Sequence, residues 1–150
     1  MAVHEERVPP LFGTPVPGCA YTGRLGAYGV ARSAHGLVAA VEDDSGRLYF
    51  PGGGVLPGES VVTALEREAQ EECGWTVAVG EQLGCAFQLI DTQDEGNFLL
   101  DARYFQLSIL SLDYVSAEHK VVWLPARACA KWMHRGCDRW FADHRLGGRL

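Results

Sequence analysis

The chain has 150 residues, of which 47% are apolar and 21% charged, and this composition is typical of one soluble globular domain. Its formal net charge of −6 and its lack of a lysine or arginine run argue against binding to polymeric nucleic acid, which depends on neutralising phosphates. No apolar stretch approaches the roughly 20 residues that span a bilayer, so we expect no membrane segment.

The five cysteines show no C-x-x-C spacing, and their odd number and scattered positions favour a reducing compartment over a disulfide framework. The first residues, MAVHEERVPPLFGTPVPGC, are charged and proline-rich and lack the apolar core of a signal peptide. We therefore predict a cytoplasmic protein in which residues 1–22 form an extended N-terminal arm and residues 23–150 a single domain.

The first part of this domain is typical of β-structure followed by a glycine-rich loop. The segments GAYGVARS (26–33), GLVAAVED (36–43) and RLYF (47–50) are bounded by turn residues and predict three strands. The third strand is expected to end at Pro51, and three consecutive glycines follow. We predict a loop at these glycines.

A helix is predicted from about Ser60 to Cys73. Ser60 is a plausible N-cap, and Gly74 stands where a helix commonly ends in the left-handed conformation. Apolar residues recur at spacings of three and four and form one stripe, made of Val62, Leu65, Ala69 and Cys73. Three glutamates fall on an adjoining stripe, Glu68, Glu71 and Glu72. The helix is therefore expected to bury one side and to present three carboxylates beside it.

The second half of the chain alternates strands and loops and ends in helices. Strands are predicted at 75–80, 83–91, 100–110 and 121–124, with loops at 92–97 and 116–120. Helices are predicted at about 126–134 and 138–145, and their tryptophans are expected to be packing residues, Trp132 and Trp140. Strands mixed with one long central helix and terminal helices indicate an α/β fold, in which helices cover both faces of a mixed β-sheet.

The central helix carries more negative charge than its own stability favours. Like charges three or four residues apart on a helix repel each other by a few tenths of a kcal/mol per pair. A hard divalent cation such as Mg²⁺ would remove that repulsion, because it prefers oxygen ligands and completes its shell with water and substrate phosphate. The preceding glycines would let the backbone approach phosphates closely. The alternative is a solvated acidic face, which is what most charge runs are.

Glycines and acids across the loop and the helix follow the pattern G-x5-E-x7-R-E-U-x-E-E-x-G-U, where U is bulky and apolar. All seven fixed glycine and polar positions are matched, by Gly53, Glu59, Arg67, Glu68, Glu71, Glu72 and Gly74. This stretch resembles the Nudix box, the signature of hydrolases acting on nucleoside diphosphates linked to another moiety. Ala69 departs from it, since the family usually has a larger aliphatic residue there. The resemblance extends over roughly residues 24–144 and implies the Nudix α/β/α sandwich.

The resemblance implies roles for the acids of the helix. Glu71 and Glu72 would be the primary ligands of Mg²⁺, with Mn²⁺ as the alternative ion. Glu68 would be a further ligand or the base that takes a proton from the attacking water. The carbonyl of Gly52 would complete the inner metal site.

The resemblance also implies roles for the residues around these acids. Arg67 would orient the carboxylates by hydrogen bonds and neutralise Glu59. Glu59 itself would support the loop–helix junction or reach the metal through water. Gly53 and Gly54 would let the backbone approach the substrate phosphates.

Several residues outside the box are further candidates. Family members often place an additional base or metal-linked acid in a loop after the box, where Glu118 and His119 stand, and the alternative is a solvated loop pair. Arg24 and Arg32 lie on the first strands, where the family commonly grips phosphate or base, although ordinary surface arginines would look the same. Four aromatic residues are candidates either for stacking on a base or for the core, Phe87, Phe98, Tyr104 and Trp123.

The sequence therefore predicts a Mg²⁺-dependent pyrophosphohydrolase, in which water attacks one phosphorus of a phosphoanhydride. Its small-molecule substrate would be a nucleoside triphosphate or a nucleotide sugar, because markers of several other subfamilies are absent. One alternative is a nucleotide-sensing module that keeps the fold without turnover, and another is an interaction protein whose acidic helix is a solvated face. Relatives are commonly dimers, so a homodimer is a further expectation, which the sequence does not resolve.

Overall fold

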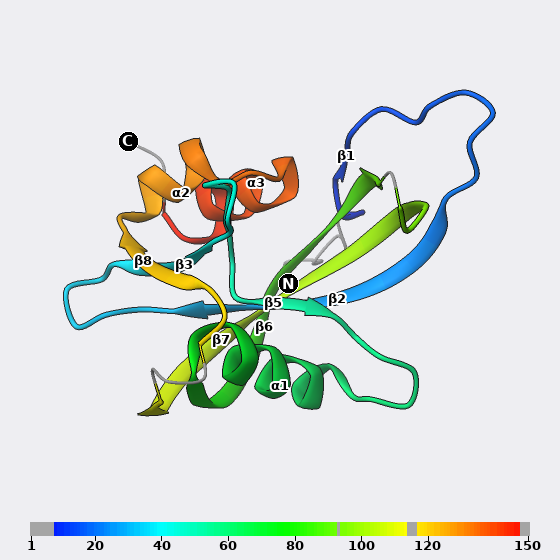
Figure 1. Cartoon of the computed structure of the whole chain (residues 1–150). Coiled ribbons are helices and arrows are strands. Elements are labelled where there is room, and N and C mark those ends of the chain that lie inside the picture. The colour runs from blue at the N-terminus through cyan, green and yellow to red at the C-terminus, as the bar shows by residue number, and fades with distance from the viewer. Residues whose placement is uncertain (1–7, 93, 114–116, 148–150) are drawn as a thin grey trace, which may run out of the picture.

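The computed structural model describes residues 8–92, 94–113 and 117–147, which form two β-sheets and three helices (Figure 1). The strands are β1 (Leu11–Phe12), β2 (Thr22–Ala31), β3 (Val38–Glu42), β4 (Leu48–Tyr49), β5 (Gly52–Gly54), β6 (Trp75–Asp91), β7 (Asn97–Leu112) and β8 (Lys120–Leu124). The helices are α1 (Val61–Cys73), α2 (Ala126–Trp132) and α3 (Gly136–Arg145). This order of strands and helices is the mixed α/β arrangement that the sequence predicts.

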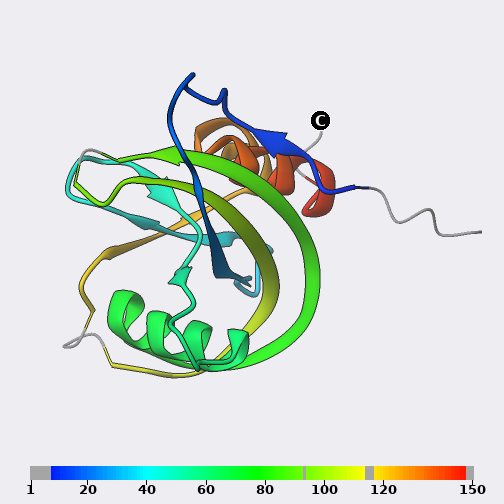
Figure 2. The same cartoon turned by 90° about the vertical axis from the view of Figure 1, so that its right-hand side faces the viewer.

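The larger sheet has the strand order β1-β6-β7-β2-β5, and the smaller sheet has the order β4-β3-β8. Strand β2 runs parallel to β7, whereas β6 with β7 and β2 with β5 are antiparallel, so the larger sheet is mixed. Figure 2 shows β6 and β7 curving together around one side of the molecule. At the edge of this sheet, the three glycines of β5 pair with Gly26, Ala27 and Tyr28 of β2.

Helices cover both faces of the larger sheet, with α1 on one side and α2 and α3 on the other (Figure 1). Successive side chains of a strand point to opposite faces, and the strand residues divide accordingly. On one face Leu107 of β7 shares a core with Leu65 of α1. On the other face Tyr104 stacks on Phe141 of α3, with 4.0 Å between ring centroids. The α/β/α sandwich is confirmed.

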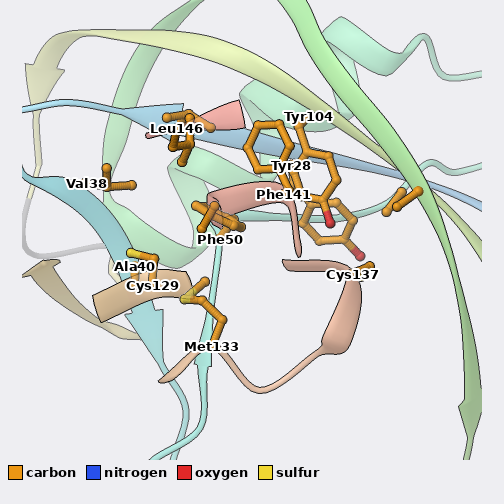
Figure 3. Packing of buried hydrophobic residues seen from close by; sticks show 14 of the residues in the cluster. Tyr28, Val38, Ala40, Phe50, Tyr104, Cys129, Met133, Cys137, Phe141 and Leu146 are labelled. Carbon is orange, nitrogen blue, oxygen red and sulfur yellow. The ribbon is translucent and has the colours of Figure 1, made fainter. Parts of the chain in front are cut away.

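The core on the α2–α3 side is built around aromatic rings (Figure 3). The ring of Phe50 meets those of Tyr104 and Phe141 edge to face, at 5.8 Å and 5.7 Å. Beside them the fully buried Asp138 accepts a hydrogen bond from the Tyr104 hydroxyl at 2.7 Å. These contacts fix the start of α3, and with it the connection from α2 that reaches the pocket described below.

Three strand predictions differ from the structure. Residues 75–80 and 83–91 belong to the single strand β6, because pairing irregularities near Thr76 and Gln82 let one long strand bend without breaking. The predicted glycine loop is strand β5, since its backbone pairs with β2. Strand β2 starts at Thr22, four residues earlier than predicted, because the pairing partner that extends it, β7, is distant in sequence.

Part of the predicted N-terminal arm lies on the sheet. Leu11 and Phe12 pair in parallel with Phe87 and Gln88 of β6. Residues 1–7 lie outside the described residues. The boundary between an arm at 1–22 and a domain at 23–150 stays a prediction.

Helix α1 begins and ends where the sequence predicts. The Ser60 hydroxyl accepts a hydrogen bond from the backbone N–H of Thr63 at 3.0 Å, and Gly74 adopts the left-handed conformation with φ of 69°. The predicted apolar stripe is wrong at Val62, which is 44% exposed, while Ala64 is buried. Val62 lies two residues before Ala64, about 200° around the helix, and therefore turns away from the sheet.

The two tryptophans of the terminal helices differ. Trp140 packs against the rings of Phe12 and His144. Trp132 is 63% exposed, with the Lys131 ammonium 4.9 Å from its ring, so its prediction as a packing residue is wrong. At the end of α2 its ring lies beyond the α2–α3 core. Among the helices of the described residues, none is both long and apolar enough for a membrane crossing.

Candidate active site

A cavity of about 490 Å³ lies between β5, helix α1 and strands of both sheets. The β5 glycines and two glutamates of α1 form what we call the acidic wall, and aromatic and basic residues from β2, β4, β7 and the α2–α3 connection form what we call the basic wall. The two meet at β5, where Arg24 lies beside Gly54. The sequence-predicted residues that line it are Arg24, Gly52, Gly53, Gly54, Glu68, Glu72, Phe98 and His119. The cavity therefore joins the glycine strand to two of the three predicted carboxylates.

The glycines of β5 are required by close packing. Gly52 has a φ of +141°, and a Cβ there would collide with the backbone of β2. A Cβ at Gly53 would lie 2.7 Å from Oε1 of Glu68, and one at Gly54 would lie 2.7 Å from Nε of Arg24. Side chains at these positions would displace a glutamate and an arginine from the cavity wall.

Glu72 is the most enclosed of the three predicted helix glutamates, with its side chain 12% exposed. Its Oε1 accepts a hydrogen bond from the backbone N–H of Gly52 at 2.8 Å, and its Oε2 lies 3.9 Å from Nε2 of His119. Burial raises the pKa of Glu72 to about 8, against the lowering effect of the Gly52 N–H. The charges of Glu68 and Glu118 also raise it. The negative charge at this position is therefore poorly compensated.

Arg67 connects the acids of the box. Its Nε and Nη2 donate to the two carboxylate oxygens of Glu59, at 2.9 Å and 3.0 Å, and Nη2 also donates to the carbonyl of Gly54 at 3.2 Å. Its Nη1 donates to Oε1 of Glu68 at 3.0 Å and to Glu71 at 3.4 Å. These hydrogen bonds from Arg67 lower the pKa of Glu59. Arg67 thus ties the loop after β5 to the acidic face of α1.

Burial raises the pKa of Glu68, even though the hydrogen bond and charge of Arg67 oppose the shift. The neighbouring charges of Glu71 and Glu118 act in the same direction as burial. Glu68 therefore resembles Glu72 electrostatically, and both carboxylates line the cavity.

Two further predicted acids lie beside the cavity and do not line it. Glu71 is more open to solvent, with its side chain 46% exposed, and Glu118 is exposed in the segment before β8. The backbone N–H groups of Glu118 and His119 donate to the carbonyls of Glu71 and Glu72, at 3.0 Å and 3.1 Å. This pairing fastens the segment to the last turn of α1 and keeps the Glu118 charge near the other acids.

The basic wall contains residues that sequence reasoning missed. Nη1 of Arg135 donates to the hydroxyl of Tyr28 at 2.9 Å, and its guanidinium lies 4.9 Å from the centre of the Tyr49 ring. All three side chains line the cavity. The sequence does show that Arg135 lies between two predicted helices. No local pattern, however, indicates that this position lines the same cavity as the glycine strand.

A second cationic contact lies along the same cavity. The guanidinium of Arg24 lies 5.1 Å from the centre of the Phe98 ring, and its Nη1 is 3.9 Å from Oε2 of Glu95. Arg24 and Phe98 are both candidates from the sequence, and the structure brings them together.

Other candidates lie elsewhere. Arg32 donates to the carbonyl of Leu146 at 3.4 Å and lines a separate cavity. Tyr104 belongs to the buried core, and Trp123 packs near Trp75 with 6.1 Å between ring centroids. Phe87 pairs with β1. The structure does not bring these four residues to the cavity.

The acidic wall was tested for its fit to a divalent cation. Among the described residues, no three histidine, cysteine, aspartate or glutamate side chains are already grouped as a metal site. The donor chemistry nevertheless fits Mg²⁺, because Glu68 and Glu72 supply partly buried oxygen donors whose pKa values are raised by burial. A cation between them would favour the charged form of both carboxylates, which burial disfavours.

Comparison with known protein families identifies the family of the domain that contains this cavity. A family model described as the NUDIX domain matches residues 24–141. The chain belongs to the NUDIX family. It is a Nudix hydrolase, and its Nudix box supplies the acidic wall of the cavity. No curated protein sequence matches the chain significantly.

Solved structures share the fold of this Nudix hydrolase. The E. coli ORF135 protein is 19% identical, with 91% of this chain and 96% of that chain covered and a TM-score of 0.67. The MutT protein from Methanosarcina mazei Go1 is 21% identical, with 85% and 94% covered and a TM-score of 0.63. The E. coli dihydroneopterin triphosphate pyrophosphohydrolase is 16% identical, with 85% and 98% covered and a TM-score of 0.61. At these identities the likeness shows the fold alone.

Proposed function

We propose that this Nudix hydrolase is a Mg²⁺-dependent pyrophosphohydrolase of a nucleoside diphosphate linked to another moiety, with nucleoside triphosphates or nucleotide sugars favoured. The observation that carries the proposal is a single cavity that is lined both by the carboxylates of Glu68 and Glu72 and by the guanidinium groups of Arg24 and Arg135. Structures of similar fold include proteins named ADP-ribose pyrophosphatase and dihydroneopterin triphosphate pyrophosphohydrolase. Such a cavity suits a ligand with an anhydride at one end and a flat base at the other.

In this proposal Glu72 and Glu71, with the carbonyl of Gly52, would hold the ion, Glu68 would lie beside it, and Mn²⁺ would serve as an alternative. When bound, the ion supplies charge neutralisation at the phosphates and lowers the pKa of a coordinated water. Glu72 is the central ligand in this proposal, because the Gly52 N–H orients its carboxylate and because burial disfavours its charged form until a cation binds.

Glu68 is the residue to which we assign proton abstraction. The oxygen of the attacking water forms a bond to phosphorus, the bridging P–O bond breaks, and the water proton passes to the carboxylate. A raised pKa makes Glu68 a stronger base than an ordinary glutamate, and its carboxylate lines the cavity. Glu71 and Glu118 are the alternative bases, and both lie further into solvent. Arg67 positions Glu68 through the hydrogen bond at 3.0 Å.

The basic wall would bind the remainder of the nucleotide. Aromatic faces accept any base by stacking, and Phe98 and Tyr49 both line the cavity. The guanidinium groups of Arg24 and Arg135 lie against these rings and can donate to phosphate or base oxygens. Arg32, which lines another cavity, has no such role in this proposal.

A substrate screen tests the proposal. Purified protein is incubated with nucleoside triphosphates, ADP-ribose, nucleotide sugars and dinucleoside polyphosphates, with Mg²⁺ or Mn²⁺, and the products are identified by mass spectrometry. We expect hydrolysis at an anhydride of at least one class, and loss of that hydrolysis in EDTA. Absence of product from every class with both ions would overturn the proposal.

The remaining expectations belong to the same proposal. A cytoplasmic location, a homodimer and a preference for small nucleotides over polymeric nucleic acid stay predictions from the sequence. Gel filtration with light scattering would determine the oligomeric state.

A further inference from the structure

A second cavity, of about 550 Å³, adjoins the active-site cavity. Tyr49, Ile90, Thr92 and Arg135 line both, so the two cavities lie side by side and share these residues. We call the second one the arginine cavity. Its basic residues are Arg47, His134, Arg135 and Arg139.

The charge of the arginine cavity is opposite to that of the chain. The protein has 13 lysines and arginines against 19 aspartates and glutamates, whereas this cavity is lined by three arginines and one acid, Asp91. Asp91 already accepts a hydrogen bond from the Tyr21 hydroxyl at 2.8 Å. Positive charge gathered in a concavity of an acidic protein attracts anions.

Two of the three arginines of this cavity have capacity for a ligand, whereas Nη1 of Arg139 already donates to the carbonyls of Met133 and His134, both at 2.8 Å. Neither Arg47 nor Arg135 forms a salt bridge with any residue that the structure describes. The charge of Arg47 acts on Asp43, whose side chain bonds mainly to Ser45 and to the backbone of its own turn. Each guanidinium has five N–H donors, and Arg135 uses one on Tyr28.

The charges of these arginines also act on one side chain, that of His134. Burial lowers the pKa of His134, and the charges of Arg47 and Arg135 lower it further. Asp43 opposes that shift, and Arg139 adds to it. Three arginines from the turn before β4, the α2–α3 connection and α3 therefore converge on the same region, although they are distant in sequence.

We propose that the arginine cavity binds a second phosphoryl group of the substrate, carried on the nucleoside away from the anhydride, for example at the 2′ or 3′ position of the ribose. The inference rests on the proposed function, because the anhydride occupies the glutamate end and the nucleoside extends past Tyr49. A phosphate dianion matches several converging guanidinium groups, which bind phosphate oxygens in pairs. The substrate class is thus a nucleotide with an additional terminal phosphate.

Calorimetry with matched nucleotides tests this inference without turnover. The probes are adenosine and guanosine 5′-monophosphates and the corresponding 2′,5′- and 3′,5′-bisphosphates, none of which contains an anhydride. Each is titrated into the full-length protein with Mg²⁺. We expect at least one bisphosphate to bind ten times or more tighter than its monophosphate. Equal affinity across every pair, or no binding of any probe at millimolar concentration, would overturn the inference.

Variants of Arg47 locate the preference, since no side-chain hydrogen bond ties this residue to the described fold. Arg47→Gln is expected to lower the bisphosphate preference at least fivefold, and Arg47→Lys to retain most of it. The matched control is Arg127→Gln, an exposed arginine of α2 outside both cavities, which should keep the preference within twofold. An unchanged preference in Arg47→Gln would contradict the assignment.

Failure of this inference is distinguishable from failure of the proposed function. Hydrolysis of nucleoside triphosphates without a bisphosphate preference would remove the arginine cavity as a ligand site and leave the hydrolase intact. A bisphosphate preference without hydrolysis of any anhydride would do the reverse.

Discussion

The two walls of the active-site cavity are built in different ways. Glu68 and Glu72 lie one helical turn apart on α1, next to the glycine strand, and are held by a network within one short stretch of sequence. Arg24 and Arg135 approach from β2 and from the α2–α3 connection, more than a hundred residues apart in the chain. In the proposed function this difference corresponds to two tasks: the compact acidic wall would supply the chemistry, and the assembled basic wall would supply recognition.

The largest expected effect is on the acidic wall. Glu72→Gln keeps the shape of the side chain and removes the charge of the residue that we propose as the central metal ligand. We expect kcat to fall at least about a hundredfold, because charge stabilisation at the transferring phosphoryl group depends on the bound ion. Steady-state kinetics on the substrate found in the screen measures this.

Glu66→Gln is the matched control for Glu72→Gln. Glu66 is an exposed glutamate of the same helix and does not line the cavity. It should keep kcat within about twofold, because surface substitutions away from a site have small effects. Retention of more than a tenth of the activity in Glu72→Gln would remove the metal role assigned to Glu72.

Arg67→Ala sharpens the account of how the acidic wall is held. Loss of the guanidinium frees Glu68 and the loop after β5, so we expect kcat to fall about 10- to 100-fold. We also expect a loss of about 1–3 kcal/mol in the free energy of unfolding, since partly buried hydrogen bonds to charged groups are removed. Urea unfolding measures the second effect. Wild-type stability together with wild-type kcat would show that Arg67 positions nothing.

Arg135→Gln tests the basic wall. If this wall recognises the nucleotide, KM should rise about tenfold while kcat changes little, since an interaction made equally with bound substrate and transition state affects KM. Tyr28→Phe, which removes only the hydroxyl that accepts from Arg135, should cause a smaller change in the same direction. A fall in kcat with no change in KM would place Arg135 with the chemistry and erase the division between the walls.

The last prediction concerns stability in the absence of metal. The pKa of Glu72 in the folded protein is raised to about 8, above the ordinary glutamate value of 4.5. Its contribution to stability is therefore complete below about pH 4.5 and is lost as the pH rises towards 8, with a slope of at most about 1.4 kcal/mol per pH unit.

Urea unfolding in EDTA between pH 5 and pH 8 measures this slope. Glu72→Gln should reduce it, leaving the smaller contribution of Glu68, whose pKa is raised in the same direction. Mg²⁺ should also reduce it by binding the folded state. An identical slope in wild type and Glu72→Gln would show that the Glu72 charge is not the cause.

Local sequence patterns predicted the acidic wall because its geometry is local. The helix limits at Ser60 and Gly74 follow from capping chemistry, and Glu68 and Glu72 share a face because of helical periodicity. Glu71 lies on the same stripe but is more open to solvent, with its side chain 46% exposed. Helical periodicity, a rotation of about 100° per residue, does not show whether the glycine strand covers Glu71 or Glu72.

The basic wall could not be predicted in the same way. Tyr28 and Arg135 meet because β2 pairs with β5 and because the aromatic core around Phe141 fixes the start of α3. Arg24 and Arg32 looked equivalent in sequence, yet the two side chains line different cavities. Strand pairing and helix packing over long sequence separations decide these positions, and a single sequence does not encode them in any local pattern.

The central claim is that the carboxylate wall is completed by a divalent cation that brings the anhydride with it. Isothermal titration of Mg²⁺ into the protein with a non-hydrolysable α,β-methylene nucleoside diphosphate tests this claim most directly. We predict saturable uptake of Mg²⁺ in the wild type and in Glu66→Gln, and its loss in Glu72→Gln. Absence of uptake in the wild type, with or without the nucleotide and with Mn²⁺ in place of Mg²⁺, would contradict the account.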